Sequence, residues 1–150
     1  MTIWVDADAL PRPVKEILVK ASVKRGVDVV LVANQWMPKP RSARVEVVTV
    51  SAGADIADDY IAENCEAGDL VITADVPLAA RVVEKDAMVI TPYGKILDEE
   101  NVREHLSIRD FSADLRDAGV DTGGPPPYGQ QQRQAFANAL DRWLTQNQKS

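Results

Sequence analysis

Aspartates follow three apolar, β-branched runs in this chain, and carboxylates in such positions can bind cations or activate water. The runs and their aspartates are residues 2–5 with Asp6 and Asp8, residues 45–50 with Asp55, Asp58 and Asp59, and residues 70–73 with Asp75. Ligands of an open α/β sheet bind at the carboxyl ends of its parallel strands. We therefore expect carboxylates from three segments to converge on one spot.

Such convergence is unfavourable unless a cation offsets it. Two unit charges about 5 Å apart at an effective dielectric of about 20 repel by roughly 3 kcal/mol. Mg²⁺ and Mn²⁺ prefer oxygen ligands and keep several waters. Such an ion generates a hydroxide nucleophile and screens a phosphate diester from carboxylates. The pattern therefore favours a divalent metal as cofactor.

Each of these acids also has a purely structural interpretation. Asp55 sits where an N-cap is expected, and Asp58, three residues on, would complete a capping pair. Asp75 precedes Pro77 and could cap the next helix, and Asp8 could serve a turn. Both interpretations stay open at this stage.

Other polar groups are expected at the same rim of the sheet. Thr73 offers a hydroxyl after its strand, and Asn34 ends another strand, where it could orient water or phosphate. Asp59 lies one helical turn after Asp55 and so shares its helix face. We take Thr73, Asn34, Asp59 and Asp8 as auxiliary residues.

Several other chemistries find no support in the sequence. Cys65 and His105 are the single cysteine and histidine, so neither a zinc cluster nor a Ser-His-Asp set can be built. No glycine-rich dinucleotide or Walker motif occurs. The segment 122–125, Thr-Gly-Gly-Pro, could present backbone N–H groups to a phosphate, or be a plain turn.

The charge distribution leaves RNA binding open. The net charge is −6, a poor match to nucleic acid, but the first 50 residues hold eight Lys/Arg against five acids. Segment 34–44 combines an aromatic residue with cations, as single-strand grooves do. The candidate RNA-binding residues are Lys15, Trp36, Lys39, Arg41 and Arg44. The alternative is a set of solvated surface charges.

The elements that must position these residues alternate between strand and helix. Apolar runs predict strands at residues 2–6, 28–33, 45–50, 69–73 and 87–91. Helical spacing and breakers predict helices at about 11–25, 55–67, 77–86, 98–106, 109–118 and 130–146. This alternation predicts a mostly parallel sheet of about five strands with helices on both faces, an α/β fold of three α/β/α layers.

Length and composition predict one domain over residues 1–150, with the helix at 130–146 docked on it through its apolar stripe. The single cysteine fits a reducing cytoplasm. We see no signal peptide and no run long enough for a membrane span. A cytoplasmic protein is therefore expected; the oligomeric state is not predicted.

Several motifs together resemble the YaiI/YqxD family of bacterial proteins. They are Trp4-Val5-Asp6-Ala7-Asp8-Ala9, Leu31-Val32-Ala33-Asn34, Asp55-Ile56-Ala57-Asp58, residues 68–75 (Gly-Asp-Leu-Val-Ile-Thr-Ala-Asp) with Pro77-Leu78-Ala79, Arg109-Asp110-Phe111 and Thr122-Gly123-Gly124-Pro125. The family is grouped with PIN-like domains, which are metal-dependent nucleases. The resemblance implies a PIN-like fold in which Asp6, Asp55 or Asp58, and Asp75 hold Mg²⁺ or Mn²⁺.

Two positions depart from the family pattern. Leu10 stands where a cysteine is usual, so that cysteine is not expected to take part in the chemistry. Gln132 stands where an acid usually precedes Arg133, so a fourth metal-directed acid from the last helix is not expected.

Three functional hypotheses follow. In the first, the chain is a metal-dependent phosphodiesterase acting on RNA, with Asp6 and Asp75 on the metal and Asp55 and Asp58 completing the site. In the second, Asp6-Ala7-Asp8 is the D-x-D of a haloacid-dehalogenase-type phosphatase, although Leu10 does not fit that pattern. In the third, the acids are caps in a non-catalytic RNA- or protein-binding module.

Overall fold

A six-stranded sheet forms the centre of the protein in the computed structural model, which describes residues 2–51, 55–102 and 128–147. Its strands are β1 (Thr2–Asp6), β2 (Asp28–Ala33), β3 (Val45–Thr49), β4 (Leu70–Ile72), β5 (Met88–Ile90) and β6 (Ile96–Leu97). Their order is β3-β2-β1-β4-β5-β6. All neighbours pair in parallel except β5 and β6, which are antiparallel.

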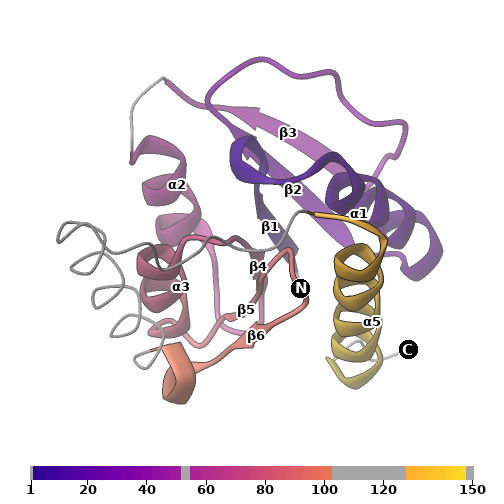
Figure 1. Ribbon diagram of the computed structural model, residues 1–150. Helices are drawn as coiled ribbons and strands as arrows, with labels where there is room; N and C mark the ends of the chain where they lie inside the picture. The colour runs from indigo at the N-terminus through magenta and orange to yellow at the C-terminus, as the bar shows by residue number, and fades with distance from the viewer. Residues whose placement is uncertain (1, 52–54, 103–127, 148–150) are drawn as a thin grey trace, which may run out of the picture.

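Helices cover both faces of the sheet, which gives the predicted three α/β/α layers (Figure 1). The described helices are the 3₁₀ turn η1 (Ala7–Ala9), α1 (Arg12–Arg25), α2 (Ile56–Asn64), α3 (Val76–Val83) and α5 (Gln130–Asn147). Figure 1 shows α2 and α3 on one side of the sheet and α1 and α5 on the other. Two separate cores result, one on each face.

The strands are buried on both faces because successive side chains point to opposite cores. Leu31 packs with α1 and α5, whereas its neighbour Val32 packs with α2 and α3. The same alternation holds for Leu70 and Val71. Near-continuous apolar runs are what a parallel sheet covered on both sides requires.

Local sequence signals set the ends of the helices. Gly26 adopts a left-handed conformation, φ 65°, and ends α1. Pro77 lies in the first turn of α3, where its missing N–H costs nothing. α3 ends at Val83 rather than at residue 86, because Asp86 is left-handed (φ 64°) and breaks the helix.

Other differences from the sequence prediction lie at short elements. The two-residue strand β6 was not predicted; so short a run carries no readable period. α2 ends at Asn64 because Cys65 is extended. Residues 99–102 are helical, as expected for the start of the 98–106 helix. The rest of that helix, the one at 109–118 and the Thr122–Pro125 turn lie outside the described residues.

The described helices do not include one that combines the length and apolar character needed to cross a bilayer.

Candidate functional site

The carboxyl ends of β1 and β4 form the point where the candidate residues meet. The chain builds β1, β2 and β3 outward in one direction and then returns to place β4 beside β1. Val5 pairs with Ile72, so the next residues, Asp6 and Thr73, emerge at the same edge. The pairing makes β1 and β4 neighbours, as the expected convergence of their aspartates requires. Such a topological switch point is where open α/β sheets bind ligands.

Thr73 connects the two strand ends through hydrogen bonds. Its hydroxyl, which is fully buried, donates to Oδ2 of Asp6 across 3.3 Å. The same Oγ1 accepts the backbone N–H of Asp75 at 3.0 Å. Asp6, itself only 8% exposed, is thereby held beside the turn that carries Asp75.

Burial makes the Asp6 carboxylate unfavourable. Desolvation raises the pKa of Asp6, and the nearby charges of Asp75 and Asp8 raise it further. The hydrogen bond from Thr73 acts in the opposite direction, because it stabilises the ionised form. The fold therefore holds Asp6 at a position where its ionised form is less stable than it is in water.

Asp75 is the N-cap of α3, so the structural interpretation of this residue is confirmed. Its Oδ1 accepts the N–H of Leu78 at 3.0 Å. Its second oxygen, Oδ2, makes no hydrogen bond to any residue that the structure describes. The cap therefore fixes the orientation of the carboxylate and leaves one oxygen available.

Asp58 joins this acidic group from the first turn of α2. The pKa of Asp58 is raised to about 6, first by burial and then by the charges of Asp75, Asp6 and Asp55. Arg81 lowers it only in part. We call Asp6, Asp58 and Asp75 the acidic edge, because the charge of Asp75 raises the pKa of Asp6 and the charges of both raise the pKa of Asp58.

Asp55 and Asp59 lie beside the acidic edge in different roles. Asp55 occupies the N-cap position of α2, but its side chain makes no capping hydrogen bond, so the predicted capping pair with Asp58 is not formed. Asp59 accepts a hydrogen bond from Arg81 of α3 at 2.8 Å. Asp59 is thus engaged by a cation, and Asp55 remains an exposed carboxylate at the rim.

Asp8 and Asn34 meet on the other side of Asp6. Oδ2 of the exposed Asp8 accepts the backbone N–H of Asn34 at 2.6 Å. The residue at position 34 therefore contributes its main chain to this contact, and the contact ties η1 to the end of β2. Asp8 is close enough to raise the pKa of Asp6.

The donor chemistry of the acidic edge suits a hard divalent cation, although the edge is not a closed cage. Among the described residues, no three His, Cys, Asp or Glu side chains are grouped tightly enough to hold a metal. Mg²⁺ is usually bound through one or two carboxylates and retains waters. Carboxylates that repel one another and lie beside a free oxygen of Asp75 fit such a hydrated ion.

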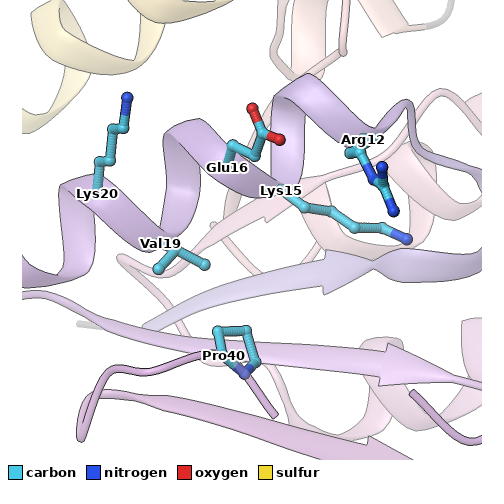
Figure 2. Close-up of a pocket in the computed structure, with 6 residues that line it drawn as sticks. All are labelled: Arg12, Lys15, Glu16, Val19, Lys20 and Pro40. Atoms are coloured by element: carbon cyan, nitrogen blue, oxygen red, sulfur yellow. The ribbon is translucent and has the colours of Figure 1, made fainter. Parts of the chain in front are cut away.

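The candidate RNA-binding residues do not form one patch. Arg44 pairs with Asp28 at 3.3 Å, at the start of β2 and β3, which is the sheet edge opposite the acidic edge. Trp36 is 80% exposed, and Lys39 and Arg41 are exposed in the same segment. Lys15 lies on α1 and lines a hollow that also contains Arg12 and Pro40 (Figure 2).

Asp69 is a buried carboxylate with a structural role that was not predicted from the sequence. It is 7% exposed and accepts N–H groups from Thr2, the Trp4 indole and Glu66, at 3.0, 3.0 and 2.9 Å. It lies at the amino ends of β1 and β4, away from the acidic edge. Asp69 opens the strand predicted at 69–73 rather than following it, and this position was the available signal for a structural role.

The fold and the acidic edge define a three-layer α/β/α protein with carboxylates at the switch point of its sheet. The family described as "Uncharacterized BCR, YaiI/YqxD family" matches residues 4–146, and the chain belongs to that family.

Relatives from several bacteria match nearly the whole chain. A UPF0178 protein of Syntrophotalea carbinolica is 52% identical over 147 residues, which cover 98% of this chain and 99% of the relative. UPF0178 proteins of Shewanella sp. (strain MR-7) and Saccharophagus degradans are 51% and 50% identical over 142 and 149 residues. These matches cover 95% and 99% of this chain, and 93% and 99% of the relatives. No solved structure matches the chain.

Proposed function

We propose that the protein is a metal-dependent phosphodiesterase that hydrolyses RNA at the acidic edge. One observation carries the proposal: Asp6, Asp58 and Asp75 lie at the switch point of the sheet, and the charge of Asp75 raises the pKa of both Asp6 and Asp58 there. Titratable groups whose pKa values are shifted by burial and by specific neighbours are concentrated at functional sites. A divalent cation bound there would offset the repulsion between the carboxylates, and this role would explain why they lie close together.

The residues of the acidic edge would have different roles in metal binding and in activation of water. Asp6 and Asp75 supply oxygens to Mg²⁺ or Mn²⁺, and the hydrogen bonds through Thr73 and Leu78 keep those oxygens in place. The bound ion supplies Lewis acidity and a water of lowered pKa. Asp58 is ionised above about pH 6, completes the site and accepts a hydrogen bond from the attacking water. Asp55 is its exposed companion at the rim.

RNA is proposed as the substrate for two reasons. The family is grouped with PIN-like domains, which are metal-dependent nucleases, and the motifs of this chain imply the same fold and activity. In addition, exposed cations and Trp36 occupy the segment 34–44, whose first residue, Asn34, donates its backbone N–H to Asp8. Cations beside an aromatic residue are the usual elements of a single-strand binding surface.

Calorimetric titration with Mn²⁺ tests the metal site directly. Wild type should bind Mn²⁺ saturably, and Asp75→Asn should abolish that binding while Asn keeps the helix cap. Asp86→Asn is the matched control, because Asp86 is exposed and left-handed, and asparagine tolerates that conformation. Absence of Mn²⁺ binding in wild type, or equal binding by Asp75→Asn, would reject the proposal. Cleavage of end-labelled RNA with and without chelator then tests the reaction.

The capping bond of Asp75 favours a second candidate, a non-catalytic binding module whose acids stabilise helix ends. This candidate predicts RNA affinity that chelator and Asp75→Asn both leave unchanged. Metal-dependent cleavage by wild type would exclude it.

A further inference from the structure

A hollow between α1 and the segment 34–44 has a mixed cationic and apolar lining. It has a volume of about 410 Å³ and is lined by Arg12, Lys15, Glu16, Val19, Lys20 and Pro40. Figure 2 shows Val19 and Pro40 facing each other across it, with the Lys15 and Arg12 side chains extending toward the same end. We call this hollow the α1 groove.

The position of the α1 groove relates it to the acidic edge. Arg12 begins α1, and only η1 and a short link separate it from Asp6. The helix rises about 1.5 Å per residue, so the lining from Arg12 to Val19 spans roughly 10 Å. Arg12 and Lys15 therefore line the end of the groove nearer the acidic edge, Lys20 lines the other end, and the groove leads away from that edge.

The charges of the lining are not neutralised within the groove. Arg12 and Lys15 form no ion pair with any described residue. Glu16, the one acid in the lining, lies 3.9 Å from Arg133 of α5. Figure 2 shows its carboxylate pointing away from Pro40. The groove consequently presents a positive end and an apolar pair of walls.

This combination matches the two parts of a nucleotide. A phosphate requires cationic donors, which Arg12 and Lys15 offer, whereas a sugar or base requires apolar contact, which Val19 and Pro40 offer. The volume falls within the range of about 300–1,000 Å³ that is typical of small-ligand sites. A peptide of acidic residues alone would use the cations but would leave the apolar walls without a matching group.

We propose that the α1 groove binds one nucleotide unit of a single-stranded RNA, with its phosphate on Arg12 and Lys15 and its sugar or base between Val19 and Pro40. This inference rests on the proposed function and deepens it, because it assigns the substrate strand a path away from the acidic edge. It also replaces Arg44, which lies at the opposite edge, as a backbone contact.

Binding of a fluorescently labelled, mixed-sequence single-stranded RNA, measured by anisotropy in chelator, tests the groove without the metal. The double variant Arg12→Gln/Lys15→Gln should bind roughly tenfold more weakly at low salt, and the slope of log affinity against log salt should fall by about 0.7, the value expected for one phosphate contact. Val19→Ala, which removes part of the apolar wall and adds no charge, should also weaken RNA binding relative to wild type. Lys24→Gln is the matched control, since Lys24 is an exposed lysine at the other end of α1.

Three outcomes of this binding experiment would overturn the inference: wild type that does not bind RNA, a double variant that binds as tightly as Lys24→Gln, or displacement of RNA by poly-glutamate at equal charge concentration.

Failure of the groove proposal can be distinguished from failure of the catalytic proposal. Asp6→Asn should abolish cleavage yet retain RNA affinity in chelator. Groove-dependent binding without Mn²⁺ binding would reject only the catalytic proposal, whereas Mn²⁺-dependent cleavage unaffected by the double variant would reject only the groove.

Discussion

The hydroxyl of Thr73 donates a hydrogen bond to Asp6 across 3.3 Å, although 67 positions separate the two residues in the chain. The same oxygen accepts the N–H of Asp75. Both contacts are possible because β4 pairs with β1 and brings the two strand ends to one edge. Thr73 is therefore the residue through which the fold positions two of the three carboxylates of the acidic edge.

Replacing Thr73 by valine, which has nearly the same shape, should destabilise the protein. The change leaves the buried Asp6 carboxylate without this donor and the Asp75 N–H without this acceptor. An unsatisfied buried polar group costs about 1–3 kcal/mol. Urea denaturation should show a loss of that size in the free energy of unfolding. Thr49→Val, at an exposed strand position, is the control and should change stability by less than about 0.5 kcal/mol. Equal stability of the two variants would contradict this account of Thr73.

Two substitutions of Asp75 should separate its capping role from its charge. Asp75→Ala removes the bond to the Leu78 N–H and should cost about 0.5–2 kcal/mol of stability in metal-free buffer. Asp75→Asn keeps an oxygen for that bond and removes the charge, so it should be clearly more stable than Asp75→Ala. Thermal and urea unfolding of the two variants measure the difference. If both lose the same stability, the cap does not act through this hydrogen bond.

The charge of Asp75 should also affect the pKa of Asp58. Because Asp75 is the strongest charged neighbour that raises the pKa of Asp58, Asp75→Asn should lower that pKa from about 6 toward the ordinary value of 3.8. Titration of the side-chain carboxyl carbon by NMR reports this directly. Glu63→Gln removes a charge from the exposed end of α2 and should leave the titration of Asp58 in place. An unchanged midpoint in Asp75→Asn would show that the two carboxylates are not coupled.

The shifted pKa of Asp58 predicts a pH dependence of folding stability. Its folded-state pKa, about 6, lies above the ordinary 3.8, so the folded protein binds this proton more tightly than the unfolded chain does. The contribution to stability is fully present below about pH 3.8 and is lost as the pH rises through about 6. Asp58→Asn should therefore gain stability relative to wild type over this interval, with a constant difference above about pH 7.

Urea titrations of wild type and Asp58→Asn at several pH values, without metal, measure this difference. Glu63→Gln on the same helix should show no comparable dependence on pH. A difference that is the same at pH 4 and pH 7 would refute the assignment. Added Mn²⁺ should diminish the advantage of Asp58→Asn, because the proposed site stabilises the ionised carboxylates of the wild-type fold.

The sequence was sufficient for those parts of the fold that depend on long, regular signals. The continuous apolar runs of β1 and β2 and the Pro-to-Gly limits of α1 indicate their structure directly. β6 and the end of α3 depend on short-range geometry, namely two residues paired with β5 and a left-handed Asp86. Neither feature has a period that a sequence window can detect.

For the candidate site, the sequence indicated which acids follow strands, but it could not decide between a cap and a free carboxylate. Asp75 caps α3 with one carboxylate oxygen and leaves the other oxygen available, whereas Asp55 occupies the N-cap position of α2 without making a capping hydrogen bond. These outcomes depend on side-chain rotation by one bond, which composition and spacing do not determine. Likewise, the pairing of Asp59 with Arg81 depends on how α2 packs against α3.

Asp69 provides the sharpest contrast with the acidic edge, because it is a buried carboxylate whose role is structural. Its two oxygens accept three N–H groups, from Thr2, Trp4 and Glu66. In Asp69→Asn an NH₂ group replaces one oxygen and must face at least one of these donors, so we expect a loss of roughly 2–3 kcal/mol in the free energy of unfolding. The fluorescence of Trp4 should change as well, since its indole loses a charged acceptor.

The control for this substitution lies at the same edge of the sheet. Asp28→Asn weakens an exposed pair with Arg44, and such pairs contribute about 0–1 kcal/mol. Asp69→Asn should therefore be clearly less stable than Asp28→Asn, and yet both should bind Mn²⁺ as wild type does, because Asp69 and Asp28 lie at the amino ends of their strands. Reduced Mn²⁺ affinity in folded Asp69→Asn would mean that the metal is bound at the opposite end of the sheet from Asp6. A loss of unfolding free energy no larger than that of Asp28→Asn would mean that the three N–H groups find other acceptors.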